Sequence, residues 1–131
     1  MLAILYDIHG NVPALEAVVA DARAAGATGW LLGGDYGTPS PWPRETLALL
    51  RTLEPATWIR GNGERWIRER PADRPEVGET YDALLPGPLS EEELDRLYRL
   101  PAEAELDGVL YVHGCVVRDD DSFGPEPSPN D

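Results

Sequence analysis

Three short apolar runs that each end at an acidic or amide side chain constrain the fold of this chain most strongly. The runs span residues 2–6, 30–32 and 56–59, and they are followed by Asp7, Asp35 and Asn62. These polar residues are 28 and 27 residues apart, which is about the length of one strand plus one helix. Regular alternation of strands and helices predicts an α/β fold with a largely parallel sheet. The unbroken apolar run at 2–6 also predicts a strand that is buried on both faces.

Helical patterns follow the first two runs. Asn11 can cap the first helix, Pro13 is tolerated in its first turn, and Gly26 is well placed to end it. Its predicted apolar stripe consists of Val12, Leu15, Val18, Val19 and Ala22. The second helix follows a proline-rich loop, and its predicted inner face carries Leu47, Leu50 and Leu53.

The second half of the chain is less regular. We expect a short helix over residues 64–70. We expect a surface excursion over residues 71–89, because this range is rich in proline and glycine. Ser90 and Glu93 form a capping box that begins another helix, and Pro101 closes it.

The last predicted element is a hairpin. Asp107 and Gly108 supply the positive φ angles of a tight turn between residues 103–106 and 109–112. Beyond it the chain becomes acidic and proline-rich, so we expect one domain over 1–117 and a poorly ordered tail over 118–131.

Charge and composition narrow the classes of function. The chain has 24 acidic and 11 basic residues and a net charge of −13, which disfavours binding to nucleic acid. A phosphorylated substrate remains compatible with this charge, because bound cations can invert the local field. With no apolar run near ~20 residues and no signal-peptide pattern, we expect a soluble cytoplasmic protein that does not enter a membrane. The single cysteine, Cys115, excludes an internal disulfide.

The polar residues at the strand ends have the chemistry of a metal site. Asp7, His9, Asp35 and Asn62 follow the three runs, and His113 joins them if the second hairpin strand is parallel to the others. A carboxylate can bridge two cations, and imidazole suits Zn, Fe, Mn or Ni better than Mg. The set therefore predicts a centre for two divalent metal ions.

Four motifs carry a resemblance to a known family. Asp-Ile-His-Gly-Asn at 7–11, Gly-Gly-Asp at 33–35, Arg-Gly-Asn at 60–62 and Val-His-Gly at 112–114 resemble the ordered motifs of calcineurin-like metallophosphoesterases. The likeness is greatest to the small bacterial phosphodiesterase branch, and it covers residues 1 to about 124.

The resemblance implies a function and a role for each residue. Asp7 and His9 would bind one metal, Asp35 would bridge both, and Asn62 and His113 would bind the second. Asn11 and Asn62 would lie near the phosphate of a small phosphate ester, which the metal pair would help water to hydrolyse. The implied fold is an α/β sandwich whose first sheet has flanking helices.

The sequence departs from the family pattern at two places. Gly63 stands where the family usually has a histidine that helps the leaving group depart. The family's later Gly-His-x-His motif and most of its second sheet have no counterpart here, so we expect impaired activity or, alternatively, a non-catalytic metal- or phosphate-binding relic. Water or a carboxylate from residues 119–121 is a candidate for the open ligand position. The uncovered first sheet would favour a homo-oligomer.

Each feature also has a structural interpretation. Asp-x-His after a strand can be a capping turn, Asn62 can be a turn residue, and His113 can be a buried structural histidine. We interpret Arg60 as structural, Cys115 as an inert small residue and the acidic run at 119–121 as solvated. A Rossmann-like nucleotide-binding module is disfavoured, because no Gly-x-Gly-x-x-Gly follows the first strand.

Overall fold

The computed structural model describes residues 1–85 and 87–121. Its elements, in chain order, are β1 (Leu2–Leu5), α1 (Val12–Ala24), β2 (Gly29–Leu32), α2 (Pro43–Leu50), β3 (Ala56–Trp58), α3 (Asn62–Arg65), α4 (Pro75–Leu84), α5 (Glu91–Tyr98), β4 (Glu103–Leu106) and β5 (Val109–Val112). The longest helix, α1, has 13 residues, and none of the described helices is long and apolar enough to cross a membrane.

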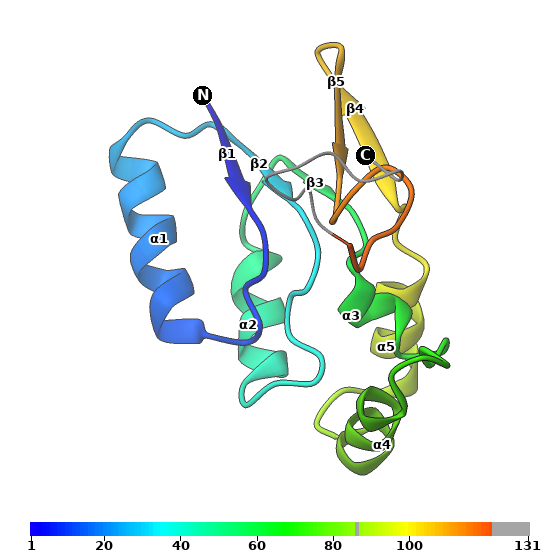
Figure 1. Ribbon diagram of the computed structural model, residues 1–131. Coiled ribbons are helices and arrows are strands. Elements are labelled where there is room, and N and C mark those ends of the chain that lie inside the picture. The colour runs from blue at the N-terminus through cyan, green and yellow to red at the C-terminus, as the bar shows by residue number, and fades with distance from the viewer. Residues whose placement is uncertain (86, 122–131) are drawn as a thin grey trace.

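The first three strands form a parallel sheet in the order β1-β2-β3, which confirms the predicted α/β class. Helices α1 and α2 cover one face of this sheet (Figure 1). Trp30 and Leu32 of β2 point toward these helices and pack in one core with Leu15 of α1 and Leu47 of α2. The alternation of side chains along β2 thus separates a helix-covered face from a second face.

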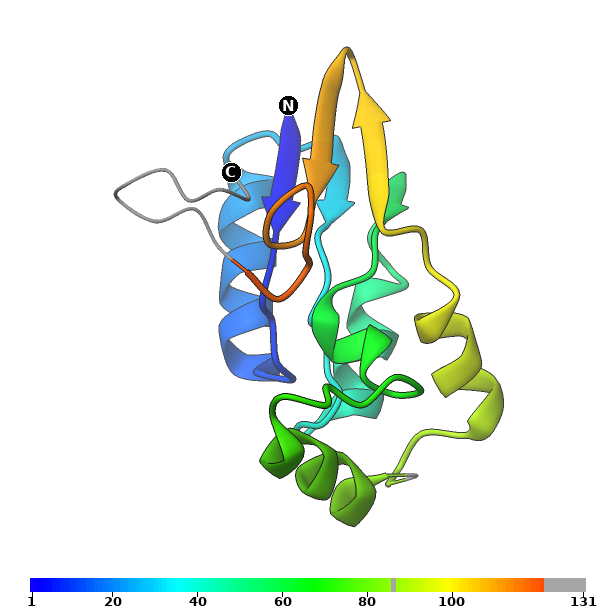
Figure 2. The same ribbon diagram turned by 45° about the vertical axis from the view of Figure 1, so that its right-hand side comes forward.

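The hairpin of β4 and β5 lies on the second face as a separate antiparallel sheet (Figure 2). Leu31, whose side chain is on this face, is fully buried. The prediction that residues 2–6 are buried on both faces was wrong, because the side chains of Leu2 and Ile4 in β1 are 38% and 47% exposed. The small second sheet leaves this edge of the first sheet open to solvent.

The predicted surface excursion over residues 71–89 contains a helix that the sequence did not predict. This helix is α4, which begins with Pro75 in its first turn. Tyr81 and Leu89 of this segment are buried and belong to the core. The side chains of Val77 and Tyr81 are one helical turn apart and pack inward, so this largely exposed segment contains a helix that contributes to the core.

The first residues of α1 and α5 agree with their predicted caps. Asn11 caps α1 by accepting a hydrogen bond from Ala14 N at 3.2 Å. The capping box of α5 is also present, since Glu93 N donates to Ser90 Oγ and Ser90 N donates to Glu93 Oε2. The predicted stripe of α1 was wrong at Val18, which is 46% exposed. The short helix predicted at 64–70 was only partly right, because α3 begins two residues earlier, at Asn62, and ends five residues earlier, at Arg65.

The beginning of the predicted tail is folded. The side chains of Asp119 and Asp120 are only 18% and 5% exposed and are paired with arginines, so the prediction of a solvated acidic run was wrong for them. Residues 122–131 lie outside the described residues. Cys115 is buried, as expected of a structural residue. Arg60 is also structural, because its Nη1 donates to the carbonyl oxygen of Tyr98 at 2.9 Å.

Candidate metal centre

The loops that follow β1 and β2 run side by side and are joined by backbone hydrogen bonds. Asp7 N donates to Gly34 O at 3.2 Å, His9 N to Asp35 O at 2.9 Å and Gly10 N to Tyr36 O at 2.8 Å. These bonds extend the pairing of the two parallel strands beyond their ends. The side chains of Asp7 and Asp35 are therefore held at the same edge of the sheet, where open α/β folds bind ligands.

Three of the candidate ligands have an unusual backbone conformation. The φ angles of Asp7, His9 and Asp35 are 52°, 46° and 54°. The other described non-glycine residue with positive φ is Asp107, which lies in the hairpin turn. Left-handed backbone is disfavoured for side-chain-bearing residues and is concentrated at functional sites. Its clustering here supports a functional role for this edge.

Two glycines let the strand ends approach closely. A Cβ atom on Gly61 would lie 2.2 Å from Asp35 Oδ1, and one on Gly34 would lie 2.4 Å from Gly61 N and 2.9 Å from His113 Nδ1. No larger residue fits at either position without a shift of its neighbours. The two glycines thus bring the loop of Asp35, the start of α3 and His113 into contact.

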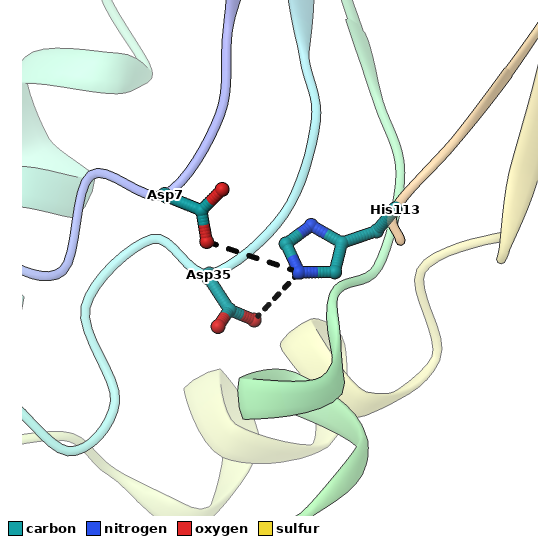
Figure 3. Close-up of side chains that lie close together, drawn as sticks. All are labelled: Asp7, Asp35 and His113. Atoms are coloured by element: carbon teal, nitrogen blue, oxygen red, sulfur yellow. Dashed lines mark ion pairs between the residues drawn. The ribbon is translucent and has the colours of Figure 1, made fainter. Parts of the chain in front are cut away.

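The acidic and imidazole side chains converge on one point. Asp7, Asp35 and His113 each offer a ligand atom, and these three atoms lie within 4.8 Å of one another. His113 Nε2 is 3.9 Å from Asp7 Oδ1 and 3.6 Å from Asp35 Oδ1 (Figure 3). His9 Nε2 approaches the other side, at 3.4 Å from Asp7 Oδ1 and 3.7 Å from Asp35 Oδ2. The parallel direction of β5 and β1, which the sequence analysis required for His113 to join, is visible in Figure 1.

The tautomer of His113 follows from its backbone contact. Its Nδ1 lies 2.8 Å from Gly33 O, and a carbonyl oxygen can only accept, so Nδ1 carries the hydrogen. In the neutral ring Nε2 then presents its lone pair to the carboxylates. In metal proteins, a hydrogen bond donated by the ring nitrogen that does not bind the metal commonly orients the histidine ligand.

Asn62 faces the same point from the start of α3. Its amide oxygen lies 3.1 Å from His113 Nε2. In this orientation the amide oxygen and His113 Nε2 both present lone pairs, and a cation bound by both atoms would satisfy them. In the opposite orientation of the amide, its nitrogen donates to His113 Nε2 and to Asp119 O, both at 3.1 Å. The second orientation gives both polar atoms of the amide a hydrogen-bonding partner, and in either orientation the amide lies 3.1 Å from His113 Nε2.

Glu64 supports the centre, and the sequence analysis did not identify it. It is fully buried, and its carboxylate accepts hydrogen bonds from Asp35 N at 2.8 Å, Tyr36 N at 3.0 Å and Gly61 N at 3.0 Å. Burial and the charge of Asp35 raise the pKa of Glu64 to about 7. Its position in the sequence could have indicated this role. Glu64 lies two residues after Asn62, at the third position of α3, where a carboxylate can accept a hydrogen bond from the capping residue.

The electrostatics of the cluster fit a divalent cation. Burial raises the pKa of Asp35, although the hydrogen bond from Gly63 N, at 2.7 Å, and the nearby histidines lower it. The ion pairs of Asp35 are with His9 and His113, which carry charge only when protonated. A cation at this point would stabilise the carboxylate, and carboxylate, imidazole and amide donors together suit a transition metal.

A cavity of about 250 Å³ adjoins the cluster. Its lining includes the candidate ligands His9, Asp35 and Asn62 together with Trp66, Val77 and Tyr81. Val77 and Tyr81 come from α4, so the segment over residues 71–89 contributes to this cavity. The cavity thus connects the polar candidate ligands with a largely apolar surface.

The structure brings together Asp7, His9, Asp35, Asn62 and His113 as the sequence predicted, while Asn11 has a different observed contact. The amide oxygen of Asn11 caps α1, which leaves only its NH₂ group for a substrate. Its predicted role at the phosphate stays a prediction.

Comparisons with known proteins agree with this geometry. The calcineurin-like phosphoesterase family model matches residues 3–123. No functionally curated protein matches the chain significantly. A crystal structure of a metallophosphoesterase from Sphaerobacter thermophilus is similar, with 29% sequence identity and a TM-score of 0.67. The similarity covers 93% of this chain and 49% of that one, so this chain spans about half the length of its structural neighbour. With most of its length matched to the family, this chain belongs to the calcineurin-like phosphoesterases.

Proposed function

We propose that the protein is a metal-dependent phosphoesterase that hydrolyses small phosphate esters, with phosphodiesters as the expected class. The observation that carries this proposal is the convergence of two carboxylates, two imidazoles and one amide at a single sheet edge. Two-metal hydrolytic sites use such donors to hold cations about 3.5–4 Å apart.

The proposed centre has two divalent cations, with Mn, Fe, Zn and Ni as candidates. Asp7 and His9 would bind one, Asn62 and His113 the other, and Asp35 would contact both. When bound, such a pair lowers the pKa of water and neutralises charge on the phosphoryl oxygens. The residues of the chain fix the geometry: Glu64 holds the backbone of Asp35, and Gly33 O orients the ring of His113.

The cavity beside the cluster is the proposed site for the organic group of the ester. Trp66, Val77 and Tyr81 give its lining an apolar surface, and its volume of about 250 Å³ suits roughly one ring or a short chain. The net charge of −13 also argues against a long polyanion such as nucleic acid as substrate. A compact, uncharged ester group fits this lining and this charge.

Gly63 bears on the choice of leaving group. A Cβ atom at this position would lie 2.9 Å from Asp35 Oδ1 and 3.2 Å from Thr38 O, so the backbone packs against Asp35 with no room for a larger side chain. Position 63 therefore supplies no group that can protonate the departing oxygen. General acids contribute roughly 10²–10⁴-fold to such steps. We expect hydrolysis to be fastest with esters whose leaving groups are themselves acidic, such as nitrophenols.

Hydrolysis of bis(p-nitrophenyl) phosphate with and without Mn²⁺ tests the proposal. We expect Mn²⁺-dependent release of nitrophenolate that a chelator abolishes and added Mn²⁺ restores. Asp35→Asn should lose this activity, while Asp107→Asn should keep it, because Asp107 shares the positive φ of Asp35 but lies in the hairpin turn. The absence of metal-dependent turnover by the wild-type protein would contradict the proposal.

A non-catalytic metal-binding protein is the second candidate, and Gly63 favours it because no side chain there can assist the leaving group. The two candidates differ in one outcome. Binding of Mn²⁺ without turnover of any aryl phosphate ester would support the second, whereas turnover would exclude it.

A further inference from the structure

The segment that follows β5 turns back on itself next to His113 of the candidate metal centre. Cys115 N donates to Arg118 O at 2.9 Å, which closes a turn directly after His113 and Gly114. A Cβ atom on Gly114 would lie 2.6 to 2.8 Å from the carbonyl oxygens of Asp121, Asp119 and Arg118. The turn therefore packs tightly on Gly114, the residue next to His113.

Arg65 holds this turn from the other side. Its Nε lies 3.0 and 2.8 Å from the two carboxylate oxygens of Asp119, and its Nη2 lies 2.7 Å from Oδ1. This forked contact is partly buried, since the two side chains are 23% and 18% exposed. Forked arginine–carboxylate pairs are strong and fix orientation as well as distance. Asp120 adds contacts with Arg74 and with Arg118, which reinforce the position of the turn.

The pair connects two elements that share no strand pairing. Arg65 is the last residue of α3, and Asn62 is the first residue of the same helix. His113 and Asp119 belong to the segment after β5, whose sheet is separate from the β1-β2-β3 sheet. The spacing of 3.1 Å between Asn62 and His113 therefore depends on contacts outside the strands.

We propose that Arg65 and Asp119 are positioning residues whose ion pair, the Arg65–Asp119 clamp, sets the spacing of Asn62 and His113 for a divalent cation. This inference rests on the metal centre of the proposed function. Asp119 acts here through the clamp and not as a replacement metal ligand, because both of its carboxylate oxygens are engaged by Arg65. Residues that orient metal ligands typically change metal affinity by 10- to 100-fold when removed.

The test measures Mn²⁺ affinity by calorimetry in the wild-type protein and in variants. Arg65→Ala and Asp119→Asn should each weaken Mn²⁺ binding by about 10- to 100-fold. Arg65→Lys should be intermediate, because lysine keeps the charge and loses the fork. Arg68→Ala is the matched control: Arg68 pairs with Glu91 and Asp95 at the surface, so Mn²⁺ affinity should not change. Circular dichroism shows which variants are folded. If Arg65→Ala does not fold, the Mn²⁺ affinities of Arg65→Lys and Asp119→Asn test the proposal.

A second measurement separates the clamp from the proposed function. The imidazole resonances of His113 in the metal-free protein report its position, and they should shift in Arg65→Ala and Asp119→Asn but not in Arg68→Ala. If the wild-type protein binds no Mn²⁺ while these resonances shift, the metal centre fails and the clamp stands. Wild-type Mn²⁺ affinity together with unshifted His113 resonances in the folded clamp variants would overturn the inference.

Discussion

The carboxylate of Glu64 accepts a hydrogen bond from the backbone N–H of Asp35 at 2.8 Å, in a fully buried contact between α3 and the loop after β2. The same carboxylate accepts hydrogen bonds from Tyr36 N and Gly61 N. One side chain therefore holds the loop after β2 and the loop after β3 beside the cluster. Asp35 has a φ of 54°, and this contact supports that disfavoured backbone. The geometry of the candidate centre thus depends on a residue that is not itself a ligand.

Glu64→Gln should lower the free energy of unfolding by about 1–3 kcal/mol. The amide can accept through only one atom, so its NH₂ group would face one of the three buried N–H donors. Chemical denaturation measures the loss. Glu93→Gln is a matched control, because Glu93 also accepts from the capping residue of a helix but is nearer the surface, and it should cost less. Equal stability of Glu64→Gln and the wild-type protein would contradict this role.

Gly61→Ala should disrupt the centre, because the added Cβ would lie 2.2 Å from Asp35 Oδ1 and 2.6 Å from Asp35 N. We expect lower stability and at least a 10-fold loss of Mn²⁺ affinity, the scale typical of displaced metal-site support. Gly29→Ala in β2 is the control, since its Cβ would meet only ordinary contacts at 3.8 Å or more. Calorimetry and thermal melts check both variants. A Gly61→Ala protein that binds Mn²⁺ as the wild type does would exclude this packing.

Tyr81→Phe should cost about 0.5–1.5 kcal/mol of unfolding free energy. The Tyr81 hydroxyl lies 2.9 Å from both Thr38 O and Gly63 O, and these contacts tie α4 to the loops around the cavity. Tyr98→Phe removes a hydroxyl that donates to the exposed Glu69, so it should change stability by much less. Urea titrations of the two variants make the comparison, and a Tyr98→Phe effect as large as that of Tyr81→Phe would show that the buried contacts contribute nothing extra.

The parallel sheet and the five candidate ligands could be predicted from the sequence because both depend on local pattern. An apolar run, a polar residue at its end and a helix after it recur with regular spacing, and parallel strands place those polar ends at one edge. Asp7, Asp35 and Asn62 were identified by this pattern alone. His113 required one further condition, the direction of the second hairpin strand, which the structure confirms.

The remaining features depend on contacts between distant segments, which local pattern does not contain. Helix α4 was missed because its proline and glycine content is typical of loops, although Val77 and Tyr81 had helical spacing. Asp119 was expected to be solvated, because nothing near it in sequence indicates that Arg65, 54 residues earlier, would pair with it. Burial of both faces of β1 failed for a similar reason: the small β4–β5 sheet leaves Leu2 and Ile4 exposed.

Calorimetric titration of the metal-free protein with Mn²⁺ tests the central claim most directly, with Asp35→Asn and Asp107→Asn measured beside it. We expect two Mn²⁺ ions per wild-type chain, a large loss of affinity in Asp35→Asn and unchanged binding in Asp107→Asn. No Mn²⁺ binding by the wild-type protein, or binding that survives unchanged in Asp35→Asn, would contradict it.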